Sequence, residues 1–117
     1  MPLDKRAAGL KSAAMTDTIV MPDDCTSMIE VRAGVDATDK ELIALLQRRF
    51  GYMRAAARIK PSRDTVRDED RKAAVINAAG DAAEARGMPR ERLEAIWDLL
   101  VENSIEYEFE IWDETRD

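Results

Sequence analysis

Residues 27–61 read SMIEVRAGVDATDKELIALLQRRFGYMRAAARIKP, and this stretch decides the fold. Ser27 and Glu30 have the spacing of a capping box, which predicts that a helix begins here. Apolar residues then recur at three- and four-residue intervals until Pro61, which ends the helix. They are Met28, Val31, Val35, Leu42, Leu45, Leu46, Phe50, Met53 and Ala57. The pattern predicts one helix of about 30 or more residues, with a length of ~50 Å.

A helix of this length is long for a chain of 117 residues. A compact domain of that size has a radius of gyration of only ~13 Å, so the helix would overhang a single folded chain. Its apolar stripe therefore needs a second copy to cover it. We predict an intertwined helical homodimer in which the long helices pair antiparallel across a twofold axis.

The rest of the chain predicts two more helices and no strands. The second should start near residues 64–66 and run towards Arg86, with Gly87 as its terminator. Pro89 suits the first turn of the third. Its apolar face comprises Leu93, Ile96, Trp97, Leu100, Val101, Ile105, Phe109 and Trp112. We expect an all-α fold with three helices per chain: one helical domain over residues 23–117, and a mobile tail over residues 1–22 in which Met15 and Met21 are alternative starts.

Composition excludes several classes of function. The net charge of −6 disfavours binding to the phosphate backbone of nucleic acids, and no apolar run approaches the ~20 residues that cross a bilayer. The chain has a single cysteine, Cys25, and no histidine, which excludes an intramolecular disulfide, the common zinc-ligand spacings and any nucleophile paired with histidine. We therefore expect a cytoplasmic protein that uses neither a metal nor a cofactor.

The bases are segregated from the acids. Residues 48–63 hold six bases and no acid, whereas residues 102–117 hold seven acids and one base. A basic run on a helix is most often a solvated face. However, the eleven-residue interval from Arg49 to Lys60 rotates by only about 20°, so both can grip opposite ends of one ligand. Arg32 is ~25 Å from Arg49 along the helix, and we expect it to enter the pocket of a partner chain instead.

These residues, in this order, resemble the all-helical chorismate mutases. The resemblance covers about residues 23–112 and rests on Arg32, Arg49 and Lys60, then Val66-Arg67-Asp68-Glu69-Asp70-Arg71, then Glu102-Asn103-Ser104-Ile105 with Glu108. It implies a pocket for a dicarboxylate enol-pyruvyl ether. Residues that match Arg32 and Arg49 hold the carboxylates, and one that matches Lys60 bonds a carboxylate and the ether oxygen. Arg71, Ser104, Asp68 and Lys72 fall at further substrate-binding positions.

Two departures from the family pattern bear on the substrate. Lys72 replaces a glutamate that accepts a bond from the ring hydroxyl in the mutases. Ser104 replaces the bulky aromatic residue of the isochorismate pyruvate lyases, although residues 22–26 and 52–62 look more like those lyases. We predict the rearrangement of chorismate to prephenate. The alternatives are elimination of pyruvate from isochorismate, which leaves salicylate, and a non-catalytic helical dimer that binds an anionic metabolite or a partner enzyme.

Glu108 follows Ser104 by one helical turn on the same face, at a position where many relatives carry glutamine. It is either a surface glutamate of the acidic segment or a catalytic residue together with Lys60 and Arg49. In a pocket, only its protonated form can donate a hydrogen bond to the ether oxygen.

Overall fold

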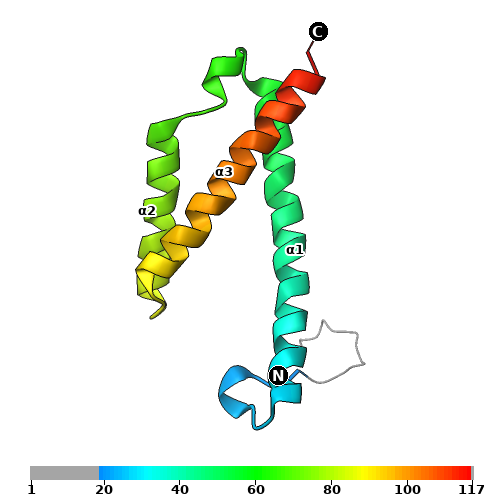
Figure 1. Cartoon of the computed structure of the whole chain (residues 1–117), viewed down its shortest axis with the longest axis vertical. Coiled ribbons are helices and arrows are strands. Elements are labelled where there is room, and N and C mark those ends of the chain that lie inside the picture. Colours follow the sequence, from blue (N-terminus) through cyan, green and yellow to red (C-terminus); the bar gives the residue numbers. More distant parts are fainter. Residues whose placement is uncertain (1–18, 117) are drawn as a thin grey trace, which may run out of the picture. The chain divides into compact units, whose positions relative to one another are not determined.

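The computed structural model describes residues 19–116, and this part of the chain forms three α-helices and two short 3-10 helices, without a strand (Figure 1). The elements are η1 (Pro22–Asp24), α1 (Met28–Ile59), η2 (Arg63–Thr65), α2 (Glu69–Ala85) and α3 (Arg90–Glu114). The predicted all-helical class is confirmed. Residues 1–18 of the predicted tail lie outside the described residues, so its mobility stays a prediction.

The chain divides into two units, Met1–Leu46 and Gln47–Asp117, and the boundary falls within α1. In the first unit, the predicted capping box begins the helix: Glu30 N donates to Ser27 Oγ and Ser27 N donates to Glu30 Oε1, both at 3.2 Å. The Thr26 amide also donates to Glu30 Oε1 at 2.7 Å. These bonds, led by the one from Thr26, lower the pKa of Glu30 and favour the charged form that caps the helix.

The apolar residues of α1 are largely exposed in the single chain. The helix has the predicted length, 32 residues, yet Ala57 is its one buried residue. The exposed fractions of Val35, Leu42 and Leu45 are 52%, 49% and 52%. By their spacing these side chains share one face of α1, and an exposed apolar face is typical of a protein interface.

The second unit is built on the hairpin of α2 and α3, which lie side by side (Figure 1). Gly87, with φ of +73°, ends α2 as predicted. The predicted start of α2 is wrong by several residues. Asp68 is extended and its carboxylate accepts a bond from Arg71 N at 3.0 Å, so the helix begins at Glu69 and residues 63–65 form a separate turn. Pro89 is the N-cap residue of α3, one position before the first turn where it was predicted, and it makes no side-chain capping bond.

A small apolar core lies between these helices. Val66, Val101 and Ile105 are buried, and four larger or β-branched residues pack partly against them: Val75, Trp97, Phe109 and Trp112. Ile96, which the sequence places on the apolar face of α3, is 56% exposed in the single chain. The apolar face of α2 is narrow and consists mostly of small side chains, so it covers only one side of α3.

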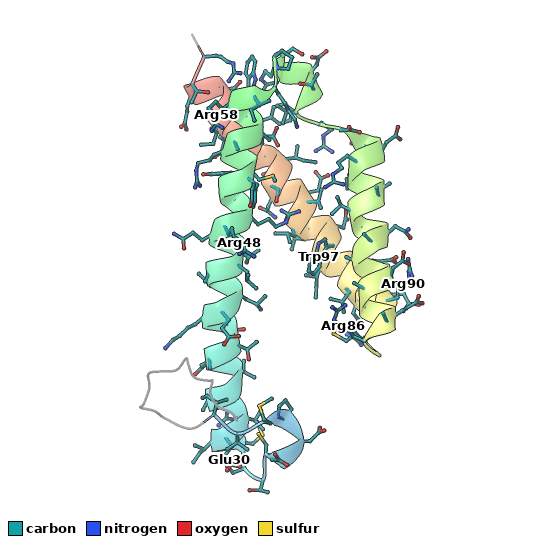
Figure 2. The ribbon with its side chains drawn as sticks, turned by 180° about the vertical axis from the view of Figure 1, so that it is seen from behind. Glu30, Arg48, Arg58, Arg86, Arg90 and Trp97 are labelled. Carbon is teal, nitrogen blue, oxygen red and sulfur yellow. The ribbon has the colours of Figure 1, made fainter. Side chains whose placement is uncertain are left out.

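Arg90 ties the turn end of this hairpin together (Figure 2). It bonds the carboxylates of Asp81, Glu84 and Glu94 at 2.8 Å each, and the side-chain oxygen of Asn77 at 2.7 Å. These carboxylates, Asp81 first, raise the pKa of Arg90. These bonds tie the end of α2 to the start of α3; at its other end, α2 has Asp68 as its N-cap and carries Arg71 in its first turn.

Candidate active site

The C-terminal part of α1 is joined to α3 by long polar side chains. Arg49 reaches Ser104, Arg54 reaches the Tyr107 hydroxyl at 3.0 Å, and Lys60 reaches Glu108. The basic segment predicted from the sequence thus faces the acidic segment of α3. Two of these bridges, from Arg49 and Lys60, involve buried partners and residues that we predicted as site residues.

Arg49 donates a hydrogen bond of 2.6 Å to the hydroxyl of Ser104, which is 2% exposed. Ser104 in turn donates to Leu100 O at 2.7 Å. Within residues 19–116, no carboxylate lies within ion-pair distance of Arg49. Burial, and then the charge of Arg71, lower the pKa of Arg49. Both causes disfavour the charged form, and a nearby anion would offset them by favouring it.

Lys60 and Glu108 form the second bridge, with Nζ and Oε2 2.7 Å apart. Glu108 is 4% exposed, which rules out the surface glutamate that the acidic sequence around it allowed. Lys60 also donates to Val66 O at 3.2 Å. Among the described residues, Glu108 Oε2 meets no donor in hydrogen-bond geometry, so the ion pair alone balances its charge. A buried carboxylate with one partner is a costly arrangement.

These two bridges converge. Arg49 and Lys60 are eleven residues apart along α1, a rise of roughly 16 Å, whereas Ser104 and Glu108 are four residues apart on α3, a rise of about 6 Å. The guanidinium and the ammonium therefore approach each other more closely than their backbones do. That the two cations bind opposite ends of one ligand stays a prediction.

The first turn of α2 adds Arg71, whose charge acts on Arg49. Arg71 is exposed, and its backbone amide is held by Asp68, the N-cap of the helix. Asp68 was predicted as a substrate-binding residue. Its carboxylate is engaged in capping, so in this structure it orients the Arg71 backbone.

Lys72 lies on α2 and reaches α3: its Nζ is 2.6 Å from Glu102 Oε2 and 3.1 Å from Asp98 Oδ1. Its pKa is raised, first by the bond to Glu102 and then by that to Asp98. Glu102 also receives two bonds from Arg67, at 2.8 and 3.0 Å. Arg67 and then Lys72 lower the pKa of Glu102 to about 2. The charge of Lys72 is thus already neutralised by carboxylates of α3.

Arg32, another predicted site residue, belongs to the first unit and is exposed there. The sequence interpretation missed Arg54, Tyr107, Glu102 and Arg116 as members of this polar network. Arg116 could have been singled out from the sequence, because it is the single base among the acids of residues 102–117. No cluster of three or more potential metal ligands occurs within residues 19–116, and no helix there is long and apolar enough to span a membrane.

Comparison with known proteins gives two matches. The family model described as chorismate mutase type II matches residues 31–109, which include Arg32, Arg49, Lys60, Ser104 and Glu108. The chain is also similar to the isochorismate pyruvate lyase of Pseudomonas aeruginosa. The two are 28% identical over 95 residues, which is 81% of this chain and 94% of the relative.

Proposed function

The chain belongs to the chorismate mutase type II family, and from this premise we propose that it converts chorismate to prephenate by a [3,3] rearrangement. The observation that carries the proposal is the pair of converging bridges, Arg49 with Ser104 and Lys60 with Glu108. They present two cations to a dicarboxylate ether in a site without histidine.

The rearrangement needs no nucleophile, because one C–O bond breaks and one C–C bond forms within the same molecule. The protein has to hold the ether in a compact conformation and stabilise the oxygen that becomes negative. In the proposed complex, Arg49 binds one carboxylate through its planar fork, and Arg71 adds positive charge beside it. Lys60 provides a compact charge next to the ether oxygen, and Glu108 donates to that oxygen when protonated.

A homodimer completes the proposed site. The exposed apolar residues of α1 provide a surface for a second copy, and Arg32 of one chain then enters the pocket of the other. Arg32→Ala and Arg49→Ala should each be inactive. Mixing the two variants should restore activity, because one of the two pockets in each heterodimer carries neither substitution. Failure of recovery after proven subunit exchange would exclude the cross-chain role of Arg32.

A second candidate is the elimination of pyruvate from isochorismate. The similarity to the lyase of Pseudomonas aeruginosa supports it, as does the neutralised Lys72 where the mutases carry a glutamate. Both reactions would use the same cations. Incubation of the purified chain with each substrate separately, followed by identification of the products, distinguishes the two.

The matched test of the site compares two adjacent arginines of α1. Arg49 is bonded to buried Ser104, whereas Arg48 is exposed (Figure 2). Loss of the bidentate contact in Arg49→Ala should lower kcat/KM by roughly 100-fold or more, while Arg48→Ala keeps it within about 2-fold. Equal effects of the two substitutions would contradict this assignment of the site, and a wild-type chain that converts neither substrate would contradict the proposed activity.

A further inference from the structure

The last turn of α1 ends beside the C-terminal turn of α3 (Figure 1), and there Arg116 binds three backbone carbonyls of the basic segment. Its guanidinium donates to Ala57 O at 3.0 Å, to Arg58 O at 3.4 Å and to Lys60 O at 2.8 Å. The last carbonyls of a helix lack partners within the helix and carry its negative dipole end. A cation with a planar fork of donors suits this position.

Trp112 fixes Arg116 and contacts the same carbonyl. The Arg116 guanidinium carbon lies 4.4 Å from the centre of the Trp112 ring, a cation–π contact. The indole Nε1 of Trp112 donates to Lys60 O at 3.3 Å. The carbonyl oxygen of Lys60 thus accepts two bonds, one from Trp112 in the last turn of α3 and one from Arg116 just beyond the end of that helix.

Lys60 needs such support because it lies just beyond the end of the helix. Its amide makes a last helical bond, to Ala56 O at 2.9 Å, and the next residue is Pro61, which has no amide to donate. At the other end, its ammonium is held by Glu108 and by Val66 O. Trp112 and Arg116 therefore hold the backbone of Lys60, and the contacts with Glu108 and Val66 O orient its side chain.

We propose that Arg116, supported by Trp112, is a positioning residue that sets the placement of the Lys60 ammonium in the active site. Arg116 bonds backbone carbonyls and a threonine hydroxyl, so it acts through Lys60. The inference rests on the proposed function for its kinetic consequence. Its structural consequence, the restraint of Lys60, can be measured without any substrate.

The kinetic test uses Arg116→Ala, with Arg86→Ala as the control. Arg86 also binds a backbone carbonyl, Ala82 O at 3.2 Å, but at the end of α2. Because Lys60 acts on charge that develops in the transition state, Arg116→Ala should lower kcat by roughly 10- to 100-fold with KM changed much less. In a Lys60→Ala background, the same substitution should cause no further loss of kcat, since the group it positions is gone.

The substrate-free test follows acylation of individual lysines by mass spectrometry under limiting reagent. In Arg116→Ala, Lys60 should be labelled several-fold faster, while exposed Lys40 stays the same. Lys72, tied to Glu102 and Asp98, should also keep its rate, because the α2–α3 hairpin does not depend on Arg116. Trp112→Phe keeps the ring but removes the Nε1 donor, so it should change Lys60 in the same direction by a smaller factor, and it replaces Arg116→Ala if that variant does not fold.

An unchanged rate of Lys60 labelling would overturn the proposal whatever the kinetics show. Equal acceleration at Lys60 and Lys72 would also overturn it, because Arg116 would then support the fold as a whole. If the wild-type chain acts on neither substrate, the proposed function fails, but the labelling still decides whether Arg116 restrains Lys60.

Discussion

Removal of the ammonium from the Lys60–Glu108 pair should destabilise the fold far more than removal of a comparable surface cation. In Lys60→Met, the carboxylate of Glu108, 4% exposed, loses the ion pair that balances its charge. Breaking a buried pair on one side typically costs about 3–5 kcal/mol. The side chain of Lys60 is itself 29% exposed, so water compensates part of this loss. We expect a decrease of about 2–4 kcal/mol in the free energy of unfolding.

The matched control is Arg63→Met, which breaks an ion pair of similar length, 2.8 Å, whose partners are both half exposed. It should cost much less than Lys60→Met, because water screens the charges of an exposed pair. Both variants are unfolded in urea at one protein concentration, because association would shift the midpoint. Adding Glu108→Gln to Lys60→Met should recover part of the loss, since the amide carries no charge. Recovery stays incomplete because Val66 O still lacks its donor.

Equal losses in Lys60→Met and Arg63→Met would show that Glu108 is solvated in solution, and would refute the buried pair.

Three further predictions follow from other contacts. Glu108→Gln should keep activity, because the amide can donate a hydrogen bond to the ether oxygen, whereas Glu108→Ala should lose activity; kcat of the two variants tests both, and equal kcat values would place Glu108 outside the reaction. Because the pKa of Glu102 is lowered in the folded state from 4.5 to about 2, its contribution to stability is present above about pH 4.5 and is lost as the pH falls towards 2. Glu102→Gln should therefore weaken the loss of stability in acid, as measured by urea unfolding over that range; an identical acid limb would contradict the bonds to Arg67 and Lys72. A Cβ at Gly80 would lie 2.7 Å from Glu94 Oε2 and 2.8 Å from Arg90 Nε, so Gly80→Ala should cost about 1–3 kcal/mol in the same assay. Gly51→Ala, where a Cβ meets only the end of the Arg54 side chain at 3.3 Å, should be neutral or stabilising by up to about 1 kcal/mol. A larger loss of stability in Gly51→Ala than in Gly80→Ala would contradict the bonds that Arg90 makes between α2 and α3.

Local signals predicted the helices well. The capping box at Ser27, the proline after Lys60 and the glycine after Arg86 act over a few residues, and each of them bounds a helix in the structure. The start of α2 was wrong because two local signals competed there. The sequence favoured a helix from residues 64–66, but the Asp68 carboxylate caps the amide of Arg71, so the helix begins only at Glu69.

Helix geometry predicts which candidate site residues share a helix face, but not which side chains they contact. The rotation between Arg49 and Lys60 follows from helix geometry, and so does the shared face of Ser104 and Glu108. The pairing of these residues across 55 and 48 positions of the chain depends on how α3 crosses the end of α1, which periodicity does not encode. The contacts of Arg116 could not be predicted for another reason: its partners are backbone carbonyls, which every residue has.

The hydrogen-bond donors of the site without substrate indicate how a dianion would bind there. A guanidinium has five N–H donors, and Arg49 is bonded to a neutral partner, so a carboxylate can bind it without displacing an anion. Lys60 differs, because its partner Glu108 is charged and cancels much of the field that it offers to a developing negative charge. Protonation of Glu108 would release the full charge of Lys60 and add a donor beside it. Under the proposed function, the electrostatic contribution to the rate therefore belongs to the Lys60–Glu108 pair, and a substitution of either residue alone measures the response of both.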